Sequence, residues 1–330
     1  KNNPYICQTN DSYPNTRTMK PLDHTEIRGN WATLLLATGP DGTMDYARLE
    51  EEIDILIDSR PCGIYSNGTA GEFYSQDEEE FLHISELLSA KCEAAGVPYQ
   101  IGVSHPCAQR SLERLRAVRR LKPGAVQVIL PDWFPVSDAE AVDFLKVMER
   151  EAEGIPLVLY NPPHAKRRLA PGEWMVLKQG IPSLAGVKVF DNDCDPAWYD
   201  TVNREVRGLS VFVPGHHLAT GVRAGMHGAY SNVACLNPYA AQRWYEQMLS
   251  DLPGALELEK RIGLFMASCI TPFITEHHYP NHACDRFMAL VGGWCDAGDR
   301  LRWPYRSIPA DYAETARRKA RNIIPEFFPA

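Results

Sequence analysis

The sequence predicts an α/β fold, a (β/α)8 TIM barrel followed by a C-terminal helical segment. Eight short β-rich runs alternate with amphipathic stretches at a repeat of roughly 25 to 35 residues. A chain of 330 residues can form one such barrel with an appendage. After Pro238 the strand pattern stops and the periodicity becomes helical. We therefore expect an N-terminal arm at 1–28, the barrel at 29–237 and the helical segment at 238–330.

The predicted strands are runs rich in β-branched and aromatic residues, bounded by turn residues. They cover residues 31–38, 62–68, 99–104, 125–131, 155–161, 184–190, 209–215 and 228–234. The seventh unit is the least regular, because "HHLATGVRAGMH" leaves room only for a short, glycine-weakened helix. Start signals support several of the helices between strands. Ser75 and Ser137 each have a glutamate three residues later, as in a capping box, and Asp195 precedes a proline.

Composition and charge narrow the possible partners. The net charge is -8, from 42 acidic and 34 basic residues without a basic stripe, so we expect no nucleic acid partner. The longest apolar runs are far shorter than the roughly 20 residues that span a bilayer, which predicts no membrane partner. The nine cysteines form no C-x-x-C pair, and the first residues have no signal-peptide pattern. We expect free thiols in a cytoplasmic protein; a processed secreted chain is the alternative.

A lysine lies inside "LAGVKVF", the apolar run of the sixth predicted strand. Successive strand residues point to opposite faces, so if Val187 and Val189 face the helices, Lys188 points into the barrel. Burial there would lower the pKa of the amine and leave a neutral fraction able to attack a carbonyl. A lone lysine more commonly forms an ion pair, here with Asp191 or Asp193, and extends to solvent.

Two further motifs follow predicted strands. The alternation in "IPLVLYN" places Tyr160 at the C-terminal end of the fifth strand, the end at which barrels build active sites. The turn "SNGTAGEF" has glycines on both sides of Thr69 and Ala70, which allows exposed N–H groups to hold a carboxylate. Each motif alone is commonplace. A buried tyrosine usually satisfies its hydroxyl locally, and Glu72 would only favour the start of the next helix.

The order of these motifs resembles that of the dihydrodipicolinate synthase and N-acetylneuraminate lyase family of class I aldolase-type enzymes. The resemblance extends from about Gly29 to Pro304 and includes "GMHGAYSNVACLNP" at the eighth strand. It implies a lyase in which Lys188 forms an imine with pyruvate or another 2-keto acid. Tyr160 would relay protons, and the Thr69 hydroxyl would orient the phenol. The imine is the electron sink, so the resemblance implies no metal and no organic cofactor.

The resemblance and the motifs also give a substrate-binding set for a small 2-keto acid. The expected substrate-binding residues are Gly68, Ala70, Trp133, His164, His216 and Ser231. The amides around Gly68 would hold the carboxylate. Trp133 would form a wall with Phe134 and Tyr65, and the histidines, with His217, would bind hydroxyls or a second acid group.

Three positions depart from the family pattern. Dihydrodipicolinate synthases usually have a second threonine in the turn, a tyrosine in the strand-four loop and an arginine after the Tyr-Asn motif. This chain has Ala70, Trp133 and Ala165 at those places. We therefore expect a hydroxylated 2-keto acid as substrate rather than aspartate semialdehyde. The alternatives are dihydrodipicolinate synthase activity and a non-catalytic 2-keto-acid-binding protein.

Two expectations concern the helical segment. "HHYPNH" supplies His277, His278 and His282, which raises the alternative of a zinc enzyme; we disfavour it because the segment is expected to lie far from the barrel mouth. The family resemblance also implies a homo-oligomer, a tetramer or a dimer. Tail aromatics such as Trp303 and Tyr305 fit either a subunit contact or packing on the chain's own barrel.

Overall fold

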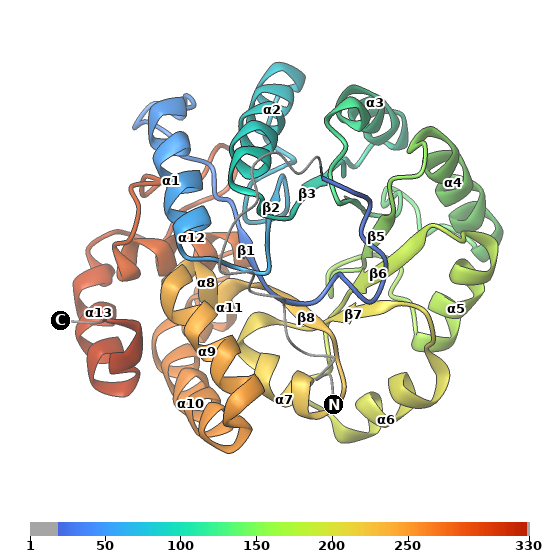
Figure 1. Cartoon of the computed structure of the whole chain (residues 1–330). Coiled ribbons are helices and arrows are strands. Elements are labelled where there is room, and N and C mark those ends of the chain that lie inside the picture. The colour runs from blue at the N-terminus through green and yellow to red at the C-terminus, as the bar shows by residue number, and fades with distance from the viewer. Residues whose placement is uncertain (1–18, 329–330) are drawn as a thin grey trace.

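Eight parallel strands close into a barrel in sequence order, each paired with its neighbours and β8 with β1 (Figure 1). The structure is a computed structural model that describes residues 19–328. The strands are β1 (Gly29–Thr33), β2 (Gly63–Ser66), β3 (Tyr99–Gly102), β4 (Ala125–Val128), β5 (Leu157–Tyr160), β6 (Leu184–Lys188), β7 (Ser210–Phe212) and β8 (Gly228–Ser231). The predicted TIM barrel is confirmed, with shorter strands than the sequence pattern indicated.

Helices between the strands form the outer layer of the barrel (Figure 1). They are α1 (Tyr46–Asp58), α2 (Glu78–Ala95), α3 (Ala108–Val118), η1 (Arg119–Leu121), α4 (Asp138–Glu151), α5 (Pro171–Gly180), α6 (Pro196–Glu205), η2 (Gly215–His217) and α7 (Leu218–Arg223). The last of these has six residues, which confirms the short seventh unit.

Two of the three predicted helix starts are confirmed, and one is wrong. Ser137 and Asp195 cap α4 and α6. The capping box of α2 is formed by Asp77 and Glu80, with Glu80 N donating to Asp77 Oδ1 over 2.8 Å. Ser75 instead donates its hydroxyl to the carbonyl of Glu72 at 2.9 Å, so it closes the preceding turn.

The chain after β8 is helical as predicted. It forms α8 (Asn232–Leu236), α9 (Pro238–Ser250), α10 (Leu252–Phe265), the π-helical η3 (Met266–Ile270), α11 (Thr271–Thr275), α12 (Asn281–Gly292), α13 (Tyr312–Ile323) and η4 (Pro325–Phe327). Helix α12 packs on α8, which itself follows β8 directly and packs on β1. Within residues 19–328, each helix is too short or too polar to cross a bilayer.

Side-chain alternation divides the core into two layers. Val187 and Val189 of the sixth strand pack with the surrounding helices, as predicted. A second cluster fills the barrel interior and consists of Leu22, Ile27, Trp31, Tyr65, Ala125, Val158, Ala185, Phe212 and Tyr230. Tyr160 pairs with Lys188 in the β5–β6 register, just as the interior Val158, two residues before Tyr160, pairs with Gly186, two residues before Lys188. Both side chains therefore point into the barrel at its C-terminal end.

The segment before β1 closes the opposite end of the barrel. Residues 1–18 of the predicted N-terminal arm lie outside the described residues, but Leu22 and Ile27 belong to the interior cluster. Leu22 N donates to the carbonyl of Gly124 at 2.8 Å, just before β4, and Ser210 at the start of β7 donates to the Ile27 carbonyl at 2.7 Å. This segment covers the N-terminal ends of the strands and leaves the Lys188 end for a ligand.

Candidate active site

Lys188 ends β6 inside a cage of aromatic rings. Its Nζ lies 4.3 Å from the ring centroid of Tyr160, 5.2 Å from that of Tyr230 and 5.5 Å from that of Tyr65. Burial lowers the pKa of the amine to about 8, although the charge of Asp285 opposes this shift. Within residues 19–328, Lys188 has no carboxylate within ion-pair distance, so the alternative of a pair with Asp191 or Asp193 is wrong.

Tyr160 joins the lysine to the turn after β2. Burial raises the pKa of its phenol to about 12, and a hydrogen bond with the Thr69 side chain partly offsets that rise. The structure therefore brings Lys188, Tyr160 and Thr69 together from three different strand ends. Their catalytic roles stay predictions.

The turn that contains Thr69 has a backbone conformation that restricts which residues can occupy it. Asn67 and Glu72 have φ angles of 53° and 49°, in the left-handed region. A Cβ at Gly68 would lie 2.1 Å from the Tyr65 hydroxyl, so only glycine fits there. Tyr65 supports the turn from inside the barrel and bonds to Gln127, and its ring also lies beside Lys188, so its expected place in a substrate wall stays a prediction. Ala70 is buried, and Thr69 is half-buried.

Glu72 forms a buried ion pair that the sequence analysis missed. Its Oε1 lies 2.8 Å from Arg286 Nη2 of α12, and its Oε2 accepts from the Arg302 backbone N at 2.9 Å. Both charged side chains are almost fully buried. The expectation that Glu72 only favours the next helix is wrong, because its positive φ turns the side chain toward the C-terminal segment. Helix α12 therefore holds one end of the Thr69 turn.

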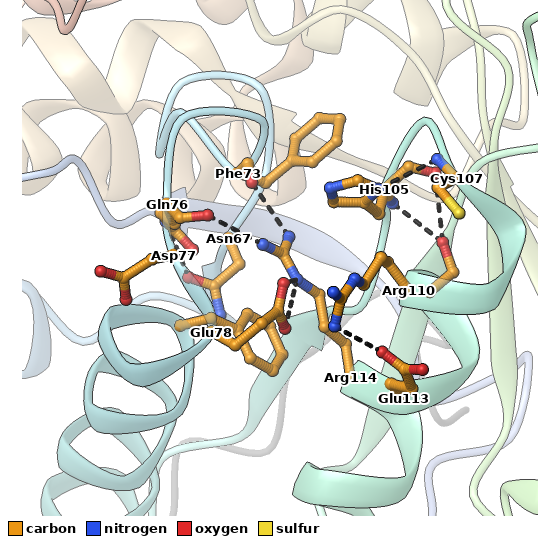
Figure 2. A network of polar contacts seen from close by, with 12 residues as sticks. Asn67, Phe73, Gln76, Asp77, Glu78, His105, Cys107, Arg110, Glu113 and Arg114 are labelled. Carbon is orange, nitrogen blue, oxygen red and sulfur yellow. Dashed lines mark hydrogen bonds and ion pairs between the residues drawn. The ribbon is translucent and has the colours of Figure 1, made fainter.

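A second buried arginine holds the other end of this loop (Figure 2). The side chain of Arg114, from α3, is fully buried, and it donates to the carbonyls of Phe73 at 2.9 Å and Gln76 at 3.2 Å. Its Nε pairs with Glu78 at 3.1 Å. Gln76 in turn donates to the Gly71 carbonyl at 2.8 Å. The loop from the Thr69 turn to α2 is thus fixed by charge-assisted hydrogen bonds at both ends.

Asp285 of α12 is a further residue that sequence reasoning missed. Its charge acts on the pKa of both Lys188 and Tyr160, which places it beside the site. Burial raises the pKa of this carboxyl to about 7, and Lys188 partly opposes the rise. Within the described chain the carboxylate has no hydrogen bond or ion pair. No local pattern marks it, since only tertiary packing of α12 on α8 brings it to the barrel mouth. The expectation that this segment lies far from the mouth is therefore wrong.

Two members of the expected aromatic wall are exposed to solvent. Trp133 and Phe134 are 79% and 75% exposed in the loop between β4 and α4. The Trp133 ring lies 5.2 Å from Lys166 Nζ, which also donates to the Trp133 carbonyl at 2.6 Å. His164, in the loop after β5, is exposed as well. Both expected substrate residues lie in loops that contact each other, with Lys166 N donating to Asp132 Oδ1 at 2.9 Å, and their substrate roles stay predictions.

His216 follows β7, and Ser231 is the last residue of β8. The His216 backbone N donates to Asn232 Oδ1 at 3.1 Å, and its Nδ1 lies 3.0 Å from Asn232 Nδ2. Burial lowers the pKa of His216 to about 4, so the imidazole is neutral near pH 7. Ser231 is buried and caps α8, its Oγ accepting from Ala234 N at 3.1 Å. Residues 232–234, expected in the strand, are helical because of this cap. The substrate roles of both residues stay predictions.

The histidines of the helical segment do not converge. His282 is buried between the rings of Tyr74 and Tyr305, with centroid distances of 5.2 Å and 4.8 Å. His277 and His278 are exposed in the preceding turn. Within residues 19–328 these three histidines form no group with metal-ligand spacing, so the zinc-enzyme alternative based on them is wrong.

Comparison with known proteins identifies the family of this chain. The sequence profile of the dihydrodipicolinate synthetase family matches residues 27–307. The chain belongs to this family. The resemblance noted from the motifs is thereby confirmed, and the matched region includes the barrel and α12.

The similar proteins are named for more than one enzymatic activity. The chain is 25% identical over 280 residues to 4-hydroxy-tetrahydrodipicolinate synthase of Neisseria gonorrhoeae, covering 84% of this chain and 92% of the relative. It is 28% identical over 166 residues to N-acetylneuraminate lyase of Escherichia coli O1:K1 / APEC, covering 50% and 49%.

Solved structures share the fold. Sialic acid aldolase of Ruminococcus gnavus superposes with a TM-score of 0.78 at 16% identity, covering 92% of this chain and all of that one. YagE, a prophage protein of E. coli K12 solved with pyruvate, gives 0.77 at 18% identity, covering 90% and 98%.

Proposed function

We propose that the chain is a lyase that binds pyruvate or a related 2-keto acid as a Schiff base on Lys188. The observation that carries this proposal is the buried amine, whose pKa is lowered to about 8 beside a tyrosine bonded to Thr69. Relatives named 4-hydroxy-tetrahydrodipicolinate synthase and N-acetylneuraminate lyase support it. So does the solved variant of R. gnavus sialic acid aldolase that is described as a catalytic lysine mutant.

The proposed chemistry uses the chain's own groups. The neutral Lys188 amine adds to the keto carbon, and the carbinolamine loses water to give an iminium ion. In cleavage, the bond at the neighbouring substrate carbon breaks and the iminium takes up its electron pair to become an enamine, which is then protonated and hydrolysed. In condensation, the enamine supplies the electron pair for the new bond. Tyr160 carries protons to and from the reacting oxygen, and Thr69 fixes the phenol. The amides of the turn around Gly68 hold the substrate carboxylate. No metal or organic cofactor enters these steps.

The preferred substrate is a hydroxylated 2-keto acid rather than aspartate semialdehyde. Ala165 offers no cation to a second acid group, and the nearby Arg167 is already paired with Asp138 and Glu173. The neutral, buried imidazole of His216 can exchange hydrogen bonds with hydroxyls. The name of the N. gonorrhoeae relative, matched over 84% of this chain, favours dihydrodipicolinate synthase activity as the second candidate.

Covalent trapping tests the proposal. The protein is incubated with pyruvate and sodium borohydride, then measured by intact mass and peptide mapping. We expect one pyruvate-sized adduct on Lys188, retained in Lys178→Met and lost in Lys188→Met. Lys178 is a matched control because burial also lowers the pKa of its amine. If folded protein forms no adduct with pyruvate or with longer 2-keto acids, the lyase proposal fails and a binding protein is favoured.

We further propose that the chain is a cytoplasmic homo-oligomer, a dimer or tetramer. Exposed aromatic side chains at the barrel rim and in the tail support an assembly, among them Trp133, Phe134 and Trp303. Light scattering coupled to size-exclusion chromatography tests it, and a monomer at micromolar concentration would contradict it.

A further inference from the structure

Three metal-binding side chains meet at the rim of the barrel, outside the proposed reaction site. They are Asp191 and Cys194, in the loop between β6 and α6, and His217, in the loop between β7 and α7. Their potential ligand atoms all lie within 4.8 Å of one another. Asp191 is fully buried, whereas Cys194 and His217 are half-buried. The cluster is therefore held by a buried carboxylate, and its other two side chains are partly accessible to solvent.

The spacing of these atoms fits a single small cation. His217 Nδ1 lies 3.0 Å from Asp191 Oδ1, and Cys194 Sγ lies 3.8 Å from Asp191 Oδ2. Ligands at about 2.0 to 2.3 Å around a tetrahedral zinc ion are about 3.3 to 3.6 Å apart. The two separations measured to Asp191 bracket that range, and the ligand atoms of Cys194 and His217 lie within 4.8 Å of each other, so the side chains would close around the ion on binding.

The chemistry of the three side chains selects a particular class of metal. A thiolate, an imidazole and a carboxylate together favour zinc over magnesium or calcium, which prefer ligand sets made of oxygen atoms alone. A carboxylate and a thiolate supply two negative charges to a divalent ion. Metal binding would replace the hydrogen bonds that the imidazole and the thiol now make with Asp191.

The surroundings of the cluster orient its ligands. Tyr199 of α6 donates its hydroxyl to Asp191 Oδ2 at 2.5 Å, as an outer partner of a ligating carboxylate does. Three consecutive residues that are not glycine, Asn192, Asp193 and Cys194, have φ angles of 50°, 55° and 65°. Positive φ angles raise the conformational energy of residues other than glycine. Here they turn the chain back, so that the Cys194 thiol lies near the carboxylate of Asp191, three residues earlier.

We propose that Asp191, Cys194 and His217 bind a zinc ion that joins the loop after β6 to the loop after β7. The ion has three protein ligands, with its fourth position on the solvent side. It lies next to His216, whose ring centroid is 4.2 Å from that of His217, and so fixes one wall of the barrel mouth. This role goes beyond the proposed reaction, whose steps at Lys188 need no metal.

Cobalt substitution tests the site independently of activity. The full chain is freed of metal with a chelator and titrated with Co²⁺, which reports tetrahedral thiolate ligation through visible bands and a near-ultraviolet sulfur-to-metal band. We expect one Co²⁺ per chain, displaced by one Zn²⁺. Metal analysis of the protein purified without added chelator should find zinc in the same ratio.

Variants distinguish a zinc site formed by these three residues from non-specific metal binding to a thiol. Cys194→Ser should abolish the sulfur-to-metal band, whereas Cys107→Ser, which changes an exposed cysteine on another loop, should leave it unchanged. Tyr199→Phe should weaken zinc binding by about 10- to 100-fold, as losses of outer partners do. His217→Asn should weaken it further while retaining the band at high cobalt concentration.

Circular dichroism establishes that each variant is folded, and wild-type protein is the reference for every titration. Absence of the sulfur band in folded wild-type protein would overturn the proposal. Persistence of the band in Cys194→Ser, or its loss in Cys107→Ser, would do so as well. Since adduct formation on Lys188 is measured separately, failure of the zinc site leaves the proposed reaction untouched.

Discussion

The two sides of the barrel mouth are built in opposite ways. On one side, the loop from Asn67 to Asp77 is mostly buried and is held by two buried arginines, Arg114 and Arg286. On the other side, the loops after β4 and β5 are exposed, and Trp133 at their tip is 79% accessible. Their arginine, Arg167, forms ion pairs with partners near the surface.

The difference in burial suggests that the two sides of the barrel mouth have different functions. A site that must hold a small carboxylate and orient a phenol benefits from groups fixed before the substrate arrives. A side that meets the variable tail of a substrate can remain accessible and adaptable. We therefore expect changes on the fixed side to act on chemistry and stability, and changes on the open side to act on the choice of substrate.

The largest effect is expected where the two sides meet, at Lys188. Lys188→Met should abolish borohydride-trapped adduct and turnover, because Lys188 supplies the amine that forms the proposed imine. The pKa of this lysine is lower in the folded than in the unfolded chain, so the lysine costs stability below the folded value of about 8. That cost falls as the pH rises toward the unfolded pKa. The melting temperature of Lys188→Met at neutral pH should equal or exceed that of wild type; a marked decrease would contradict this.

The next largest effect distinguishes the two arginines. Arg286→Met leaves the buried Glu72 carboxylate without its ion partner and should lower the free energy of unfolding by about 3 to 5 kcal/mol. Arg167→Met removes pairs whose acidic partners, Asp138 and Glu173, are exposed, and should cost less, about 1 kcal/mol. Chemical denaturation of both variants measures these values. Equal losses would mean that the two sides do not differ in rigidity.

Tyr160→Phe should slow turnover by about 10² or more while leaving the fold intact, because proton transfer at the reacting oxygen is lost. Steady-state kinetics on the true substrate measures it, and full activity would show that the phenol relays no proton. Thr69→Val should give a smaller decrease in the same direction, since it removes only the hydrogen bond that orients the phenol.

The pH dependence of adduct formation gives a subtler test. The rate should rise with pH around a midpoint near 8, as the ammonium of Lys188 becomes the free amine. Asp285 raises the pKa of Lys188, so Asp285→Asn should move this midpoint to lower pH. Trapping rates measured across neutral and mildly alkaline pH determine both midpoints. A midpoint that stays in place would show that the carboxylate does not act on the amine.

The smallest effect on the reaction centre is expected from Trp133→Ala. Its exposed ring contacts Lys166 rather than Lys188, so trapping of pyruvate and the melting temperature should be unchanged. A change in KM for the complete substrate with little change in kcat would support a role for the open side in selecting the tail. Loss of pyruvate trapping in this variant would refute the division between the two sides.

The sequence was sufficient for features that depend on local periodicity. Alternation along β5 and β6 placed Tyr160 and Lys188 on the inner face, and glycine spacing marked the Thr69 turn. The eight-unit pattern predicted the barrel, because each unit repeats the same local signals. Even the weakness of the seventh helix could be predicted from its glycines.

Features that depend on distant segments could not be predicted in this way. Asp285 and Arg286 reach the site only through packing of α12 on α8, and nothing in their local sequence distinguishes them from surface charges. The exposure of Trp133 and Phe134 was missed for a related reason. Their residue types suggested an apolar wall, but the loop after β4 contacts the loop after β5 and leaves both side chains exposed. The cluster around Asp191 likewise requires two loops separated by a strand.

The segment from Leu22 to Ile27 has a kinetic consequence. Because this segment covers the far end of the barrel, both products of the proposed reaction would leave through the one open end, and a keto acid bound to Lys188 would occupy the inner position. In the proposed reaction the keto acid would therefore bind first and leave last. In the cleavage direction the partner fragment departs first, so added pyruvate should be a competitive inhibitor against the intact substrate, whereas the partner fragment should not.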